Sequence, residues 1–281
     1  MSTDRSTGAA APAARRVTVP AVRAAKGRAE PLAMLTAYDA PTARLLDDAG
    51  VEILLVGDSV GMVVAGLEST LPVTLDEIVY HTRAVCRGRR RALVVADLPF
   101  LSYQASVEAA VLNAGRLLKE AGADAVKLEG GEAMAPQIRA IVAAGIPVMG
   151  HVGLAPQAVH ALGGYRVQGR EAAAREAIVA DARAVEAAGA FALVVEGVPG
   201  SLGAEVTRAV GIPTIGIGAG PHCDGQVLVL HDLIGLVPEG RAPRFVRRYA
   251  DVGGAIRRAA AEYVADVKAG RFPGPGETYE G

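Results

Sequence analysis

Eight short aliphatic segments, each followed by a stretch of helical character, predict that the 281-residue chain folds as one closed (β/α)8 barrel. The helical stretches repeatedly end in Ala-Gly, as in "KEAGADAVKLE" and "EAAGAFALVVE", and the next strand begins shortly afterwards. Glycine at this position accommodates the left-handed conformation that closes many helices. Parallel strands need such crossover connections, and about eight of them without a break in composition favour a barrel over a doubly wound sheet.

The composition agrees with buried parallel strands covered by alanine-rich helices. Hydrophobic residues make up 51 % of the chain and aromatic residues only 4 %, with no tryptophan. The core must therefore consist mostly of Val, Leu, Ile and Ala, which suits strands that are buried on both faces. The first predicted strand is not followed by the GxGxxG fingerprint of dinucleotide-binding sheets, which also disfavours the doubly wound alternative.

The predicted elements follow one another along most of the chain. The strands are expected at residues 32–36, 51–57, 91–100, 123–130, 146–153, 191–197, 212–220 and 226–235, the last being the weakest. The helix after the second strand has its own start signal, because Thr74 is followed by Glu77 in a capping box. Apolar spacing near 3.6 residues predicts extra amphipathic helices over residues 243–270, before an irregular tail rich in Pro and Gly.

Charge, cysteine content and hydropathy exclude several classes of protein. The net charge is −1, from 29 basic and 30 acidic residues, which argues against a nucleic-acid-binding protein. Cys86 and Cys223 lie far apart, so a disulfide framework or structural zinc site is not expected. The chain lacks an apolar run of about 18 residues and a secretory signal. We therefore expect no membrane partner, a cytoplasmic location, a disordered tail over residues 1–16 and a single barrel domain over residues 17–281.

Polar side chains end several of the predicted strands, and in a (β/α)8 barrel these ends converge on one mouth. They are Asp58 and Ser59 after strand two, Asp97 at strand three, Lys127 and Glu129 at strand four, His151 at strand five and Glu196 at strand six. A single carboxylate after a strand is usually a helix cap or turn former. The four acids in this set would lie together at the mouth, where like charges must share protons or surround a cation. Their hard oxygen ligands favour Mg²⁺.

The residues alone leave the roles of three of these side chains open. Lys127 points to the same face as Glu129 and either pairs with a carboxylate or holds an anionic substrate. His151 on its own is more simply explained as a loop histidine with satisfied hydrogen bonds. Glu196 ends a very apolar run, so burial should raise its pKa toward the range of a general base, unless a neighbouring backbone group or lysine satisfies it.

Several sequence blocks occur in order between about residues 17 and 240 and together resemble one family. They include "GDSVGM", "ADLPF", "AVKLEGG", "GIPVMGHVGLAPQ", "GGYRVQGR" and "IGIGAGPHCDGQVLVLHDLIG". In this order and spacing they closely resemble the ketopantoate hydroxymethyltransferases. The resemblance implies a Mg²⁺-dependent barrel of the phosphoenolpyruvate/pyruvate type that assembles as a homodecamer. It also implies transfer of a one-carbon unit from 5,10-methylenetetrahydrofolate to 3-methyl-2-oxobutanoate, which gives 2-dehydropantoate in pantothenate biosynthesis.

The resemblance further implies a role for each strand-end residue. Asp58 and Asp97 resemble the metal ligands, Glu129 lies near the metal through water or substrate, and Glu196 resembles the base. Mg²⁺ chelated by the 2-oxo acid would stabilise the enolate that forms when the C3 proton leaves. The residues that the resemblance implies on the substrate side of the site are Asp58, Ser59, Asp97, Lys127, Glu129 and His151.

The sequence departs from the family pattern at two places, and two other functions compete with the one that the resemblance implies. Arg170 ends the GGYRVQGR block where many relatives carry Lys, and the tail ETYEG differs from the family ending. A lyase or mutase of the same enolate-forming superfamily would use the same carboxylates, but it would carry a Lys-Lys-Cys-Gly-His-like lid, which this sequence lacks. An inactive scaffold barrel would be expected to have lost a strand-end acid, and all four are present.

Overall fold

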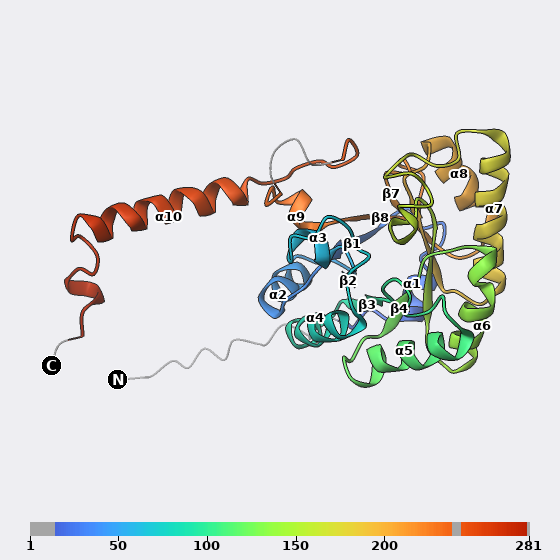
Figure 1. Cartoon of the computed structure of the whole chain (residues 1–281), viewed down its shortest axis with the longest axis horizontal. Coiled ribbons are helices and arrows are strands. Elements are labelled where there is room, and N and C mark those ends of the chain that lie inside the picture. The colour runs from blue at the N-terminus through green and yellow to red at the C-terminus, as the bar shows by residue number, and fades with distance from the viewer. Residues whose placement is uncertain (1–14, 238–242, 280–281) are drawn as a thin grey trace, which may run out of the picture.

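The computed structural model describes residues 15–237 and 243–279, and in it eight parallel strands close into a barrel (Figure 1). Each strand pairs with its neighbours in sequence, and β8 pairs with β1 to complete the ring. The strands are β1 (Leu32–Thr36), β2 (Ile53–Val56), β3 (Leu93–Asp97), β4 (Ala125–Lys127), β5 (Val148–Gly153), β6 (Ala192–Glu196), β7 (Thr214–Ile217) and β8 (Gly225–Leu228). The predicted fold class is confirmed, and a strand lies within or overlaps each of the eight predicted ranges. The eighth range, 226–235, was too long, because β8 ends at Leu228 and residues Leu230–Leu233 form α9.

Helices surround most of the barrel, and α1 closes the end at which the strands begin. The α-helices are α1 (Val19–Arg23), α2 (Ala40–Asp48), α3 (Val60–Val63), α4 (Leu75–Gly88), α5 (Val107–Lys119), α6 (Ala135–Ala143), α7 (Ala172–Ala187), α8 (Gly200–Ala209), α9 (Leu230–Leu233) and α10 (Val252–Lys268). Short 3-10 turns are η1 (Glu132–Met134), η2 (Pro156–Ala158) and η3 (Pro275–Glu277). The predicted capping box is present, because Thr74 and Glu77 bond each other's backbone N–H at the start of α4.

The core has two layers because each strand buries both of its faces. Inside the barrel, Met34, Ile53 and Met149 belong to a cluster that Val22 of α1 seals from below. Outside it, alternate residues such as Leu54 and Val94 pack beneath the helices. This double burial is the reason that the strands read as continuous aliphatic runs in the sequence.

Helix ends mostly follow the predicted Ala-Gly pattern, with one exception. The glycines with positive φ after α2, α5, α6 and α7 are Gly50, Gly122, Gly145 and Gly189. The segment "RAVGIPTIGI" is also expected to end its helix on the glycine, Gly211, but α8 already ends at Ala209 and its C-cap Val210 is extended. Because the chain leaves that helix in an extended conformation, Gly211 does not need the left-handed conformation, and the prediction was wrong there.

The helix layer is incomplete over β8 and β1. Residues 218–224 connect β7 to β8 without a helix, and the helix after β8, α9, has only four residues. Side chains alternate between the two faces of a strand, so Ala33 and Gln226 point outward, and both are exposed. Outward residues of β2 and β3, such as Leu54, are buried instead. The described residues of the single chain therefore leave one strip of the barrel wall without a covering helix.

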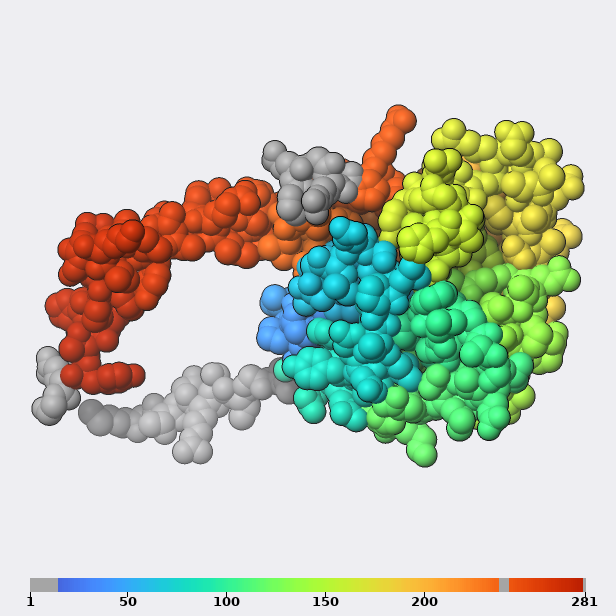
Figure 2. All heavy atoms as spheres, viewed as in Figure 1, coloured from blue at the N-terminus to red at the C-terminus, as the bar shows by residue number. Residues whose placement is uncertain are grey.

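The C-terminal helix α10 extends away from the barrel and packs little against it (Figures 1 and 2). Only Gly254 of its 17 residues is buried. Its large apolar side chains Ile256, Tyr263, Val264 and Val267 are all exposed. The helix thus presents an apolar stripe that stays largely exposed in the described part of the single chain, although Phe272 contacts the ring of Tyr263.

The prediction of helices over residues 243–270 was wrong for the first part of that range. The helix begins only at Val252, where Asp251 accepts a hydrogen bond from the Gly254 N–H as N-cap. Before it, the Tyr249 N–H donates to the Leu233 carbonyl at 2.8 Å. These residues are therefore held against the end of α9 rather than in a helical ladder.

No helix in the described ranges combines the length and the hydropathy needed to cross a membrane. The predicted disordered tail falls almost entirely on residues 1–14, outside the described residues. The division into this tail and one domain over residues 17–281 stays a prediction.

Candidate active site

The structure brings six of the seven predicted site residues into one cluster at the mouth of the barrel. Each comes from the carboxyl end of a strand, which is where barrel geometry makes side chains converge. Buried members of the cluster, each 5 % exposed or less, are Asp58, Asp97, Lys127, Glu129 and His151. Glu196 completes it at the end of β6, through its contact with His151.

A buried ion pair joins β3 to β4 at the centre of the cluster. Lys127 Nζ lies 2.9 Å from Asp97 Oδ1, and both side chains are almost fully enclosed. The other oxygen of Asp97, Oδ2, accepts a hydrogen bond of 3.1 Å from the Asp58 backbone N–H. Burial would lower the pKa of Lys127, but the carboxylates of Asp97, Glu129 and Asp58 outweigh it and raise the pKa above its usual value. Of the two roles left open for Lys127, the structure therefore contains the pairing with a carboxylate.

Two further carboxyl groups are buried with less compensation. Burial and the charge of Asp97 raise the pKa of Asp58 to about 7, against the opposing effect of Lys127. Burial likewise raises the pKa of Glu129 to about 7, although His151 and Lys127 oppose it. The one lysine thus does not neutralise the acids around it, and the cluster retains a surplus of negative charge that a cation could offset.

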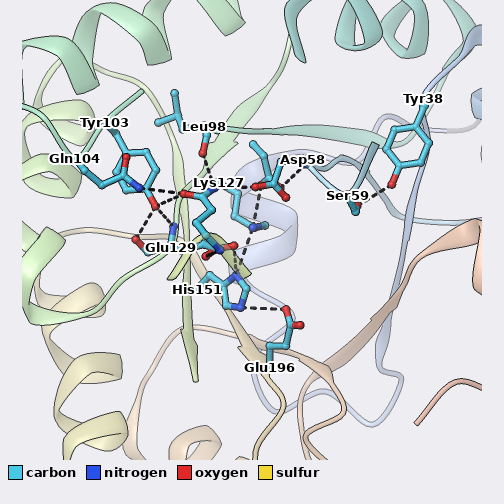
Figure 3. Close-up of polar contacts among 12 residues, drawn as sticks. Tyr38, Asp58, Ser59, Leu98, Tyr103, Gln104, Lys127, Glu129, His151 and Glu196 are labelled. Atoms are coloured by element: carbon cyan, nitrogen blue, oxygen red, sulfur yellow. Dashed lines mark hydrogen bonds and ion pairs between the residues drawn. The ribbon is translucent and has the colours of Figure 1, made fainter. Parts of the chain in front are cut away.

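His151 connects this acidic cluster to Glu196 (Figure 3). Its Nδ1 lies 3.4 Å from Lys127 Nζ, and its Nε2 lies 3.2 Å from Glu196 Oε2. Burial and the charge of Lys127 lower the pKa of His151 to about 4, so the ring is neutral near pH 7. An ammonium group only donates, so Nδ1 accepts and the ring proton resides on Nε2, which lies near Glu196 but makes no hydrogen bond in the structure.

Glu196 has the environment that the sequence predicted for it. Burial raises its pKa to about 7, with Lys127 opposing and Asp97 reinforcing the shift. Its side chain is 17 % exposed, more than those of Lys127 and Asp97. The expected desolvation is confirmed, whereas its role as a base stays a prediction.

Ser59 lies at the edge of the cluster, where its hydroxyl and Asp97 Oδ2 both flank Gly57, and its hydrogen bond goes to Tyr38 and not to one of the acids. Its Oγ lies 2.8 Å from the hydroxyl of Tyr38, and Figure 3 shows this pair away from Lys127, Glu129 and His151. Tyr38 follows the end of β1, and the sequence analysis did not identify it. Its position shortly after a predicted strand was the only signal in the sequence. Tyr38 was missed because only acids, bases and residues next to them were selected at the strand ends.

Gln157 is a second residue that the sequence analysis missed. It lies in η2, after β5, and is 6 % exposed. Its Nε2 donates to Asp58 Oδ2 at 2.9 Å, and its backbone N–H donates to Glu129 Oε2 at 3.0 Å. The quoted block "GIPVMGHVGLAPQ" ends on this residue, but a neutral amide gives no charge signal that would single it out.

The acids of the cluster fit a hard divalent cation that also binds substrate oxygens. In the described residues, no three His, Cys, Asp or Glu side chains already stand close enough to hold a metal by themselves. Mg²⁺ usually takes only one or two protein carboxylates, together with waters and substrate oxygens. Carboxylate oxygens from Asp58, Asp97 and Glu129 are ligands of the type that Mg²⁺ prefers.

Solved structures of low sequence identity share the architecture of this chain. A 2,3-dimethylmalate lyase, described as a PEP mutase/isocitrate lyase superfamily member, matches with a TM-score of 0.54 at 16 % identity, covering 92 % of this chain and 89 % of that one. A phosphonopyruvate hydrolase in complex with oxalate and Mg²⁺ matches with a TM-score of 0.57 at 16 % identity, covering 92 % of each chain. At such identity these likenesses bear on the fold alone, and they agree with the predicted (β/α)8 barrel.

Sequence comparison gives much closer relatives. The 3-methyl-2-oxobutanoate hydroxymethyltransferase of Geotalea daltonii is 56 % identical over 94 % of this chain and 99 % of its own. The enzyme of the same name from Moorella thermoacetica is 59 % identical over 92 % of this chain and 96 % of its own. The family model for ketopantoate hydroxymethyltransferase matches residues 16–275. The chain therefore belongs to the ketopantoate hydroxymethyltransferase family, as the sequence blocks predicted.

Proposed function

We propose that this enzyme transfers a hydroxymethyl group from 5,10-methylenetetrahydrofolate to 3-methyl-2-oxobutanoate and forms 2-dehydropantoate, a step of pantothenate biosynthesis. The observation that carries the proposal is the buried acid cluster around Lys127, with Glu196 beside it, on a chain 52–59 % identical to enzymes named for this reaction. The lyase or mutase alternative is not favoured, because solved structures with those activities share only the fold and at most 21 % identity.

The acids would hold Mg²⁺, with Asp58 and Asp97 as ligands and Glu129 close to it through water or the substrate. The unbalanced negative charge of the cluster supports this assignment. Once bound, Mg²⁺ would supply the positive charge that stabilises an enolate of the 2-oxo acid. Lys127 lies against the same acids and would add positive charge on the substrate side.

Glu196 would take the C3 proton of 3-methyl-2-oxobutanoate. A carboxyl group with a pKa near 7 is deprotonated in part at neutral pH and is basic enough to accept a proton. His151 would orient it, since its Nε2 lies 3.2 Å from Glu196 Oε2. The electrons of the C–H bond then form the new bond to the one-carbon unit. One water supplies the hydroxyl group, and tetrahydrofolate leaves. Ser59 would contact the substrate from the Tyr38 side.

We further propose that the enzyme is a cytoplasmic homo-oligomer, which the family resemblance makes a decamer. The exposed apolar stripe of α10 and the uncovered strip of barrel wall over β8 and β1 support assembly. A cavity of ≈ 410 Å³ lies against this strip and is lined by residues that include Gly218, Gln226 and Phe245. An apolar helix of a second copy of the chain is the occupant that such a surface suits.

The first prediction tests the activity itself. With Mg²⁺ and C3-deuterated 3-methyl-2-oxobutanoate, the protein should exchange deuterium for solvent hydrogen, because the enolate forms without folate. With methylenetetrahydrofolate added, mass spectrometry should detect 2-dehydropantoate. A protein treated with EDTA is the control. If neither exchange nor product depends on Mg²⁺, the proposed function is wrong.

The second prediction concerns the base. Glu196→Gln keeps the shape of the side chain but cannot accept the proton, so C3 exchange should fall by about 100-fold or more. Binding of 3-methyl-2-oxobutanoate, measured by calorimetry in the presence of Mg²⁺, should be retained. Undiminished exchange would remove Glu196 from the role of base.

The third prediction concerns pH and metal. Asp58, Glu129 and Glu196 have pKa values raised to about 7 in the fold, so the folded state binds more protons than the unfolded state below that pH. The melting temperature of the metal-free protein should therefore fall as pH rises from about 5.5 through 7.

Mg²⁺ should offset this loss, because it favours the ionised carboxylates. The rise in melting temperature on adding Mg²⁺ should be larger at about pH 8 than at about pH 6. NaCl at matched ionic strength is the control. An equal rise at both pH values would contradict the assignment of these acids to a cation site.

The fourth prediction tests assembly through α10. Ile256→Asp places a charge in the apolar stripe and should shift the protein to smaller species in sedimentation velocity, because burying an unpaired carboxylate is costly. Ala261→Asp introduces the same charge on the same helix outside the stripe and should leave the assembly intact. Identical behaviour of the two variants would count against α10 as an interface.

A further inference from the structure

The amide of Gln157 is fixed in one orientation by its hydrogen bonds. Its Oε1 lies 2.8 Å from the Tyr103 hydroxyl and 3.1 Å from Gln104 Nε2, and both groups can donate to it. Its Nε2 faces two acceptors, Asp58 Oδ2 at 2.9 Å and the Leu98 carbonyl at 3.0 Å. A flipped amide would set oxygen against two acceptors and nitrogen against the donors, so only this arrangement satisfies the surroundings.

The same residue contacts a second acid through its main chain. The Gln157 backbone N–H donates to Glu129 Oε2 at 3.0 Å, while its side chain holds Asp58. Glu129 follows β4 and Asp58 follows β2, and no hydrogen bond joins these two side chains directly. Gln157 is therefore a bridge that sets where one oxygen of each acid lies.

The support beneath this bridge is also buried and specific. Tyr103 is 1 % exposed, and its hydroxyl accepts from the Glu129 N–H at 3.1 Å. The hydroxyl thus touches both the main chain of Glu129 and the amide oxygen of Gln157. Rotation of the Gln157 side chain would break its contact with the Tyr103 hydroxyl along with the bond to Asp58, which makes the bridge rigid.

A neutral amide suits this position better than a charged side chain. Lys or Arg would also donate to Asp58, but would cancel negative charge that the cluster needs to attract a cation. The amide orients one carboxylate oxygen, leaves the other available, and adds no net charge. We propose that Gln157 is a positioning residue that holds Asp58, and through its main chain Glu129, in the arrangement that binds the divalent cation. The inference rests on the proposed function, since it concerns the same cation site.

The test measures metal affinity directly in the full-length protein. Mn²⁺ serves as the probe, and electron paramagnetic resonance counts the free ion during titration. Gln157→Met keeps the length of the side chain but removes both side-chain donors, and it leaves the backbone N–H to Glu129 in place. We expect its Mn²⁺ dissociation constant to rise by about 10- to 100-fold, the range for lost outer contacts to metal ligands.

Gln137→Met is the matched control, because Gln137 is also a buried glutamine but lies in α6, and its Oε1 has no hydrogen-bond partner. It should bind Mn²⁺ as the wild type does, whatever its melting temperature. Loss of affinity in Gln157→Met alone supports the positioning role. Wild-type affinity in Gln157→Met, or an equal loss in both variants, overturns it.

A second variant covers the case in which Gln157→Met does not fold. Gln104→Leu removes one of the two groups that can donate to Oε1 and leaves the bonds from Gln157 to both acids in place. It should weaken Mn²⁺ binding by a smaller factor, because Tyr103 can still donate; unchanged affinity would then overturn the inference. Failure of the wild type to bind Mn²⁺ would instead refute the proposed cation site itself, so the two failures are distinguishable.

Discussion

The buried ion pair between Lys127 and Asp97 is the interaction on which the arrangement of the site depends. It lies across the β3–β4 pairing, at the level where these strands leave the barrel. Buried charges are costly unless they are paired, and here one lysine lies among several carboxyl groups. The fold therefore tolerates an unfavourable concentration of acids at its mouth. The raised pKa values of Asp58, Glu129 and Glu196 have their largest cause in this burial.

His151 divides this cluster into two chemically different parts. On one side lie the acids around Lys127, which suit a cation and the oxygens of a substrate. On the other side lies Glu196, which is more open and suits proton transfer. The imidazole of His151 contacts both parts, and because its pKa is lowered to about 4 it is neutral and adds no charge between them. In the proposed function, metal binding and proton abstraction would therefore fall on separate carboxylates within one mouth.

The sequence predicted the parts of this structure that follow from local periodicity. Each strand is a short aliphatic run because it is buried on both faces, and each strand end directs its polar residue to the mouth. That is why the sequence alone placed Asp97 and Glu196 at the mouth of the barrel. Where the chain departs from the repeat, as before Val252, a contact with α9 replaces the local helical preference.

Tyr38 and Gln157 could not be found in the same way. Their significance comes from partners far away in the sequence, since Gln157 is 99 residues from Asp58. Neither carries a charge, so composition and spacing give no reason to select them. Ser59 could be placed at the mouth from the sequence, but its bond to the Tyr38 hydroxyl could not, because that partner lies on another strand end.

The uncovered barrel wall and the detached α10 have a consequence for how the fold is maintained. In the proposed oligomer, the helix supplied by one chain would complete the wall of another, so part of each core would be intermolecular. The free energy of folding would then include an association term and would depend on protein concentration. Dilution would act on this protein as a mild denaturant, and it would loosen first the strip at β8 and β1, which closes the ring of strands.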